Sequence, residues 1–245
     1  MTRAVRGVRW YRQLGGTFIP LLAGLVLMLV LAPLLDEIPI ASTLLVSVIL
    51  LTGIFTVYRN PRLRIAVTAG LVVALLLRWL AYSFGSEHET ILVFAHLVVS
   101  SYFAFIGVIV VASVLGHREV THNTLIGAVC GYLLIAYVFA YGYATLEAAT
   151  PDAPFLAGQS SDVADPGRFG RTGGELLYFS FVTLTTLGYG DIHPVSPIAR
   201  SLSILEVLCG QLYLAAFIAR LISLLRGRDA PAGEPPRGQQ GAAEP

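Results

Sequence analysis

The chain has 245 residues, of which 56% are hydrophobic and only 13% are charged. Soluble domains carry about 25% charged side chains, so this composition excludes an ordinary soluble protein and indicates a polytopic membrane protein. The formal net charge of +1 gives no basis for binding nucleic acid. Cys130 and Cys209 both fall inside apolar runs, so the sequence implies no disulfide framework.

The first segment, residues 1–16, carries four arginines separated by apolar residues. We interpret it as a cytoplasmic basic flank that fixes the orientation of the protein in the membrane. Two alternatives stay open, a short amphipathic helix on anionic lipid and a signal peptide.

Six apolar runs follow, and each reaches the ~17–25 residues that cross ~30 Å of hydrocarbon. They are residues 17–35, 38–58, 63–84, 90–116, 122–147 and 196–226. Arginines gather at alternate ends of these runs, which predicts that both termini lie in the cytoplasm of a multi-pass protein of the cell membrane. The first four runs form a predicted four-helix peripheral membrane domain, residues 17–120.

The fourth run contains no arginine. A voltage sensor needs ~3–4 gating charges at helical spacing, so we expect no gating by an arginine ladder. Arg78 lies in the third run beside Trp79 and Tyr82. We interpret it as a side chain that reaches toward an aromatic belt at the interface, with a gating charge as the alternative.

A short helix is predicted over residues 173–185, after a loop rich in proline and glycine. Thr172 and Glu175 have the spacing of a capping box at its start; Glu175 as an ion ligand is the alternative. About 13 residues span only ~20 Å, so the helix should enter the membrane half-way and return. Its negative dipole end would then point at the membrane centre, where a cation must be stabilised.

The segment that follows this helix places two glycines around one aromatic residue and ends in an acid. Glycine allows the backbone to turn carbonyls in directions that a side chain forbids, and such carbonyls can replace the hydration shell of a cation. Residues Thr186-Leu187-Gly188-Tyr189-Gly190 resemble the selectivity filter of potassium channels, commonly TVGYG. Thr183, Thr185 and Asp191 extend the resemblance.

This resemblance implies a prokaryotic-type potassium channel with six spans, a re-entrant pore helix and a filter loop, in an all-α fold. Dehydrated K⁺ would be held by the carbonyls of Thr186, Leu187, Gly188 and Tyr189, with the Thr186 hydroxyl at the inner site and Gly190 completing the filter. One chain supplies one strand, so a homotetrameric pore is expected. K⁺ is then the permeant ion, and no cofactor is implied.

Two departures from the family pattern concern the support of the filter. The family commonly has two tryptophans where Tyr178 and Phe179 stand, and the second usually donates to the filter tyrosine. Phe179 has no donor, so Tyr189 needs another partner or is held by packing. Some relatives have a glutamate at the position of Val182, paired with the acid after the filter. Asp191 is therefore expected to bond to backbone or water.

The last run contains two candidate gating residues. Gly210 lies twenty residues after Gly190, which matches the hinge glycine of potassium-channel inner helices; close helix packing is the alternative. Glu206 is costly in a membrane span unless paired. It would brace the pore helix and the back of the filter, or be buried and protonated.

These features predict a pore domain over residues 121–226 and a disordered cytoplasmic tail over 227–245. The expected function is a potassium-selective channel subunit. The alternative is a modulatory or uptake-system subunit with a channel-like filter. The sequence shows no serine-protease motif, so we do not expect an enzyme. The expected partners are three further copies and membrane lipids, with no soluble partner.

Overall fold

The computed structural model describes residues 17–35, 38–54, 61–84, 89–116, 121–150, 154–157 and 173–229. Seven helices and two short strands make up these residues. They are α1 (Ile19–Leu35), α2 (Pro39–Thr52), α3 (Pro61–Phe84), α4 (Glu89–Gly116), α5 (His122–Ala149), β1 (Phe155–Ala157), α6 (Gly173–Leu184), β2 (Ile192–Pro194) and α7 (Pro197–Asp229). The basic segment 1–16, Thr172 and the tail beyond Asp229 lie outside the described residues.

Four of the helices are long and apolar enough to cross a membrane within the described part of the chain: α3, α4, α5 and α7. The other two predicted spans are shorter than expected, with 17 residues in α1 and 14 in α2. At 1.5 Å per residue α2 extends about 21 Å, less than a ~30 Å hydrocarbon core. Pro39 occupies the first turn of α2 and Gly53 caps its end, although apolar residues continue beyond Gly53. The count of six spans stays a prediction.

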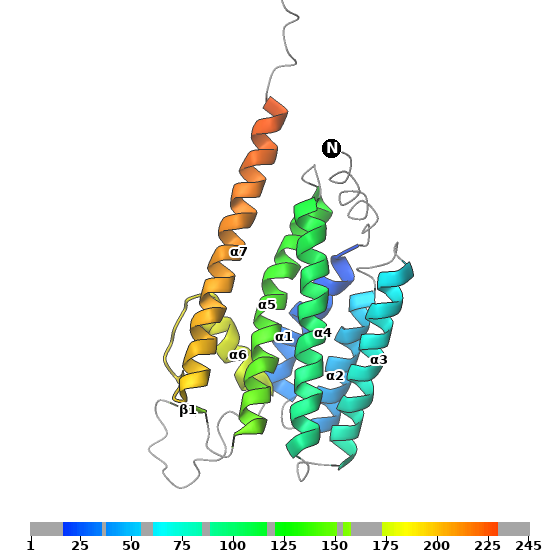
Figure 1. Cartoon of the computed structure of the whole chain (residues 1–245), viewed down its shortest axis with the longest axis vertical. Coiled ribbons are helices and arrows are strands. Elements are labelled where there is room, and N and C mark those ends of the chain that lie inside the picture. The colour runs from blue at the N-terminus through cyan, green and yellow to red at the C-terminus, as the bar shows by residue number, and fades with distance from the viewer. Residues whose placement is uncertain are drawn as a thin grey trace, which may run out of the picture.

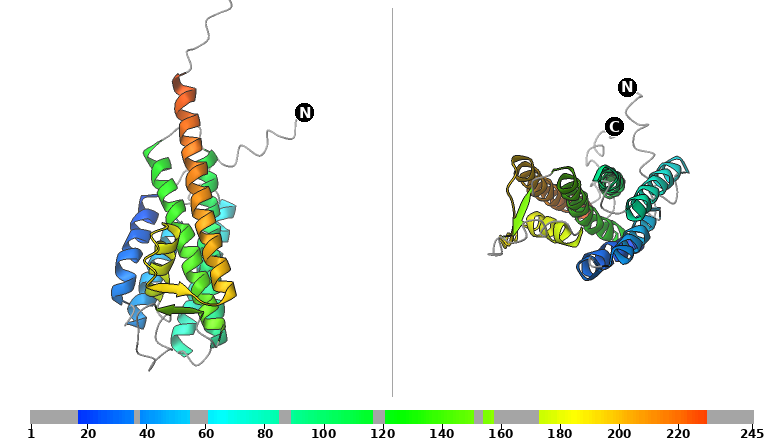
Figure 2. Two further views of the ribbon diagram at one scale, coloured as in Figure 1. Left: turned by 90° about the vertical axis from the view of Figure 1, so that its left-hand side faces the viewer. Right: turned by 90° about the horizontal axis from the view of Figure 1, so that it is seen from below.

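The helices form a bundle in which α5 lies between α4 on one side and α6 and α7 on the other (Figure 1; Figure 2, right). Helix α3 packs on α4, and α1 contacts α2, α5 and α6. Two buried tyrosines connect these layers: Tyr137 Oη donates to Leu25 O at 2.6 Å, and Tyr102 Oη donates to Leu50 O at 2.8 Å. The four N-terminal helices and α5 therefore share one hydrophobic core.

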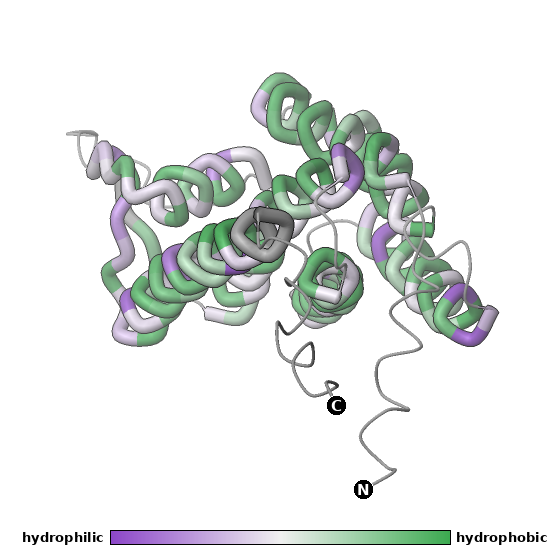
Figure 3. The backbone as a smooth tube through the Cα atoms, turned by 90° about the horizontal axis from the view of Figure 1, so that it is seen from above, coloured by the Kyte–Doolittle hydropathy of each residue, from purple (hydrophilic) through white to green (hydrophobic). Residues whose placement is uncertain are grey.

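Helix α7 is the longest element and projects beyond the other helices at one end (Figure 1). It continues to Asp229, three residues into the segment 227–245 that was predicted to be a tail. Hydrophobic residues make up much of the helical bundle when it is seen from above, with hydrophilic residues interspersed (Figure 3). Large apolar side chains on α7 stay exposed in the single chain, among them Ile204, Leu208, Leu212 and Ile218.

A two-stranded antiparallel ribbon, unforeseen in the sequence, joins the segment before α6 to the segment after it (Figure 2, left). Leu156 of β1 pairs with His193 of β2, and Val195 N donates to Pro154 O at 2.9 Å. The ribbon fixes the chain on its way from Asp191 into α7.

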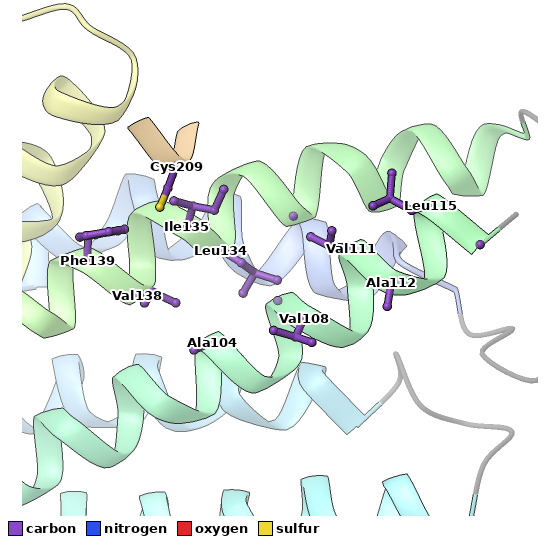
Figure 4. A pocket seen from close by; sticks show the side chains of 13 residues that line it. Ala104, Val108, Val111, Ala112, Leu115, Leu134, Ile135, Val138, Phe139 and Cys209 are labelled. Atoms are coloured by element: carbon purple, nitrogen blue, oxygen red, sulfur yellow. The ribbon is translucent and has the colours of Figure 1, made fainter. Parts of the chain in front are cut away.

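An apolar cavity of about 700 Å³ lies between α4 and α5, with Cys209 of α7 at one end (Figure 4). Its wall contains small residues such as Ala104, Gly107 and Gly131, together with Leu134 and other aliphatic side chains. The lining offers no charged side chain, so this cavity is not a candidate site for a cation.

Candidate functional site

Helix α6 carries the candidate site at its C-terminal end. It has 12 residues, with Glu175 in its first turn, where a carboxylate is favoured by the helix dipole. Leu176, Leu177, Phe179 and Leu184 are buried against its neighbours. The helix extends about 18 Å, and it ends one residue earlier than predicted. Thr172 lies outside the described residues, so the capping box with Glu175 stays a prediction.

The backbone beyond α6 is folded back onto the helix end by its amide groups. Thr186 N donates to Thr183 O at 3.0 Å. Leu187 N and Gly188 N both donate to Val182 O, at 2.9 and 3.3 Å. In a planar trans peptide the C=O points away from the N–H. The carbonyls of Thr186 and Leu187 therefore point away from α6.

The sign of φ alternates along the same backbone. Thr186, Gly188 and Gly190 have φ values of 59°, 61° and 74°, whereas Leu187 and Tyr189 do not have positive φ. Alternation of this kind gathers successive N–H groups on one side of the chain and leaves the carbonyls on the other. Thr186 is the single non-glycine residue with positive φ in the described part of the protein, and such strain concentrates at functional sites.

Every residue from Thr185 to Asp191 is exposed in the single chain. The side chains of Leu187 and Tyr189 are 55% and 68% exposed. Thr183 is half-buried, and the Thr185 hydroxyl donates to Phe181 O at 2.7 Å. We call the segment Thr185 to Asp191 the exposed strand, although it belongs to no β-sheet. Its carbonyl side thus faces no part of the described chain, and it is available to a ligand or to other subunits.

Asp191 is held by Tyr178. The phenol donates to Asp191 Oδ2 at 2.6 Å, and this bond keeps the pKa of Asp191 below its ordinary value. Asp191 was expected to bond to backbone or water, and backbone amides do contribute, but the bond from the Tyr178 side chain was not predicted. Positions 178 and 182 are four apart on one helix face, so Tyr178 reaches the acid that a carboxyl at Val182 would otherwise meet.

Phe179 points into an aromatic cluster rather than toward the exposed strand. Its ring lies 5.2 Å from the rings of both Tyr143 and Phe155, measured between centroids, in edge-to-face geometry. Phe155 belongs to β1, so the cluster joins α5, α6 and the ribbon. Neither partner was predicted from the sequence, because an isolated aromatic residue in a helix or a loop gives no signal of its contacts.

Glu206 of α7 is fully buried behind α6. Tyr143 Oη donates to Glu206 Oε2 at 2.6 Å, and Ser180 Oγ is hydrogen-bonded to Glu206 Oε1. Ser180 Oγ also lies 2.7 Å from Ala136 O. One carboxyl group therefore joins α5, α6 and α7. The polar partners Tyr143 and Ser180 were not predicted, and a serine within an apolar run is the one signal the sequence offered.

Gly210 of α7 lies against the last residue of α6. A Cβ at Gly210 would approach Leu184 Cδ1 to 2.5 Å. Tyr132 of α5 donates to Leu184 O at 3.1 Å. In this conformation Gly210 permits close packing of α7 on α6, and α7 runs through it without interruption.

No group of three His, Cys, Asp or Glu side chains within the described ranges could hold a metal ion. The oxygens at the end of α6 that could meet a cation are backbone carbonyls and threonine hydroxyls.

Comparison with known proteins finds similarity to potassium channels over part of the chain. The chain is 34% identical over 84 residues to the inward rectifier potassium channel Kirbac3.1 of Paramagnetospirillum magnetotacticum, a match over 34% of this chain and 23% of that protein. It is 39% identical over 64 residues to two pore potassium channel c of Oryza sativa subsp. japonica, over 24% of this chain and 14% of that protein. The chain thus spans less than a quarter of the length of these curated relatives. Residues 133–227, which include α6, the exposed strand and most of α7, match the model of a family described as ion channel.

Proposed function

We propose that this chain is a subunit of a potassium-selective channel of the cell membrane. The observation that carries the proposal is the backbone of Thr186 to Gly190, whose amides bond back to α6 and whose φ values alternate in sign. The carbonyls of Thr186, Leu187, Gly188 and Tyr189 replace the hydration shell of K⁺. The Thr186 hydroxyl closes the inner site, and Asp191 lies at the outer mouth.

A single strand cannot surround an ion, so the working channel is a homotetramer with four strands about one axis. Exposure of the whole segment from Thr185 to Asp191, and of the apolar face of α7, supports this assembly. Four α6 helices then direct their negative ends at the centre of the membrane, where a cation is otherwise poorly solvated.

Opening and closing do not use an arginine ladder. Within the described length of α4 no arginine occurs. Gly210 and Glu206 are the candidate gating residues, because both contact α6 from the inner helix. Both termini lie in the cytoplasm, as the placement of arginines predicts.

The test is current from the purified full chain in planar bilayers, with a potassium gradient opposed by a sodium gradient. We expect reversal near the potassium equilibrium potential and shallow voltage dependence. Reversal near the sodium potential would end the selectivity proposal. Absence of current from the chain alone, with current restored by another subunit, would favour the modulatory alternative.

A further inference from the structure

A buried chain of polar groups runs behind α6 and connects three helices. It starts at Tyr143 on α5, passes through Glu206 on α7 and Ser180 on α6, and ends at the backbone carbonyl of Ala136 on α5. All four residues are excluded from solvent, with Glu206, Ser180, Tyr143 and Ala136 each 0% exposed.

The protons available to these hydrogen bonds can be counted. Three oxygen–oxygen contacts need one proton each: Tyr143 Oη with Glu206 Oε2, Glu206 Oε1 with Ser180 Oγ, and Ser180 Oγ with Ala136 O. Tyrosine and serine hydroxyls supply one proton each, and a backbone carbonyl only accepts. An ionised carboxylate also only accepts. With Glu206 ionised, one of the three contacts would bring two acceptors together without a proton.

The surroundings of Glu206 point the same way. Its hydrogen-bond partners among the described residues are two hydroxyl groups, and neither is a cation. A buried carboxylate without a cationic partner is strongly disfavoured, both in protein interiors and at membrane depth. A neutral carboxylic acid removes that penalty and supplies the missing donor.

We infer that Glu206 carries a proton on Oε1 and forms the centre of a one-directional hydrogen-bond chain, from Tyr143 through Glu206 and Ser180 to Ala136. Each contact then has one donor and one acceptor. Because Ser180 belongs to α6, this chain of hydrogen bonds fixes α6 to α5 and α7. The exposed strand depends on α6 in turn, since Leu187 N and Gly188 N bond to Val182 O, two residues beyond Ser180.

Glu206 is thus a positioning residue for the strand, and this role rests on the proposed channel function, whereas its protonation does not. Infrared difference spectra of the full chain in lipid at neutral pH test the protonation directly. We expect a carbonyl band of a protonated carboxylic acid in the wild-type protein that is lost in Glu206→Gln. The control Asp191→Asn should keep the band, because the bond from Tyr178 lowers the pKa of Asp191 and leaves that group ionised.

A second variant keeps the test valid if Glu206→Gln fails to fold. Ser180→Ala removes the acceptor of the Glu206 O–H and should shift the acid band. A wild-type minus Glu206→Gln spectrum with carboxylate bands in place of the acid band would overturn the inference, as would an acid band that Ser180→Ala leaves unmoved. Neither spectrum requires ion flux, so failure of the channel proposal would appear separately, in the bilayer currents.

Discussion

The backbone conformation of Gly190 restricts which residues this position of the candidate site can hold. Its φ of 74° lies in the left-handed region, and nothing lies within 4 Å of the place where a Cβ would stand. Substitution by alanine therefore meets no clash but costs roughly 1–2 kcal/mol of backbone strain. We predict that Gly190→Ala loses potassium conduction or potassium-over-sodium selectivity, measured as bilayer current and reversal potential.

Gly142→Ala is the matched control for that experiment. Gly142 lies in α5, and a Cβ there also meets nothing within 4 Å, but its φ is not positive. Alanine in a helix interior is favoured over glycine by about 1 kcal/mol, so this variant should conduct normally with equal or higher stability. Unchanged current in Gly190→Ala would count against the assignment of Thr186 to Gly190 as the filter.

The bond between Tyr178 and Asp191 predicts a pH-dependent effect of Tyr178→Phe. The bond lowers the pKa of Asp191 from its ordinary value of 3.8, and hydrogen bonding to Asp191 raises the pKa of Tyr178 to about 12. The bond to ionised Asp191 thus stabilises the folded protein above about pH 4. This stabilisation is lost as the pH falls through the lowered pKa of Asp191 in the folded protein. We expect Tyr178→Phe to lower the melting temperature slightly at neutral pH, and the difference from wild type to vanish at lower pH.

The control for this prediction is a double-mutant cycle with Asp191→Asn. If the two side chains act through one bond, the effect of Tyr178→Phe should shrink in the Asp191→Asn background. The loss should stay at or below about 1 kcal/mol, because Asp191 is exposed and Tyr178 is only partly buried in the single chain. Additive effects of the two changes at neutral pH would show that the bond does not contribute.

Single residues also show what could be predicted from sequence. The spacing of Gly188 and Gly190 indicated an unusual backbone conformation at these two positions, whereas the residue type of Thr186 gave no signal of its positive φ. The partner of Asp191 could not be predicted from the sequence, since the contact depends on where the Tyr178 phenol lies in three dimensions. The same holds for Ser180 and Tyr143, whose partner Glu206 comes from another helix.

Among the elements, α7 and α6 meet at a point where one added methyl group matters. A Cβ on Gly210 would stand 2.5 Å from Leu184 Cδ1, and Leu184 is fully buried. Overpacking of this kind usually costs about 1–3 kcal/mol. We predict that Gly210→Ala lowers the thermal stability of the full chain in detergent.

The double variant Gly210→Ala with Leu184→Ala separates close packing from a hinge. Removing the Leu184 side chain makes room for the new methyl group. Gly210→Ala should therefore cost less stability in the Leu184→Ala background than it costs in the wild-type protein. If Gly210 serves only packing, adding Gly210→Ala to Leu184→Ala should leave opening unchanged. A further loss of open probability in the double variant would favour the hinge. No recovery of stability would contradict the packing interpretation.

The elements differ in how well their bounds could be predicted. Helices α3, α4 and α6 begin and end within two residues of expectation, because proline, glycine and short polar linkers bound their apolar runs. The α-helix of α2 ends at Thr52, whereas the predicted apolar run continued to residue 58, of which residues 55–58 lie outside the described part of the chain. The ribbon of β1 and β2 was missed altogether, because three-residue strands have too few positions to show a period of two.

For the whole molecule, the number of strands around one ion follows from a mixing experiment. If four chains form each channel and Gly190→Ala is inactive in any of them, equal co-expression with wild type leaves about one assembly in sixteen wholly wild type. We therefore predict that the potassium current falls far below the half expected for independent subunits. The number of chains in each assembly is checked independently by measuring the mass of the purified protein in detergent, which should correspond to four chains. Co-expression of Gly142→Ala with wild type is the control. A current of one half would mean that each chain conducts alone, in which case the exposed carbonyls of Thr186 and Leu187 would not line a shared axis.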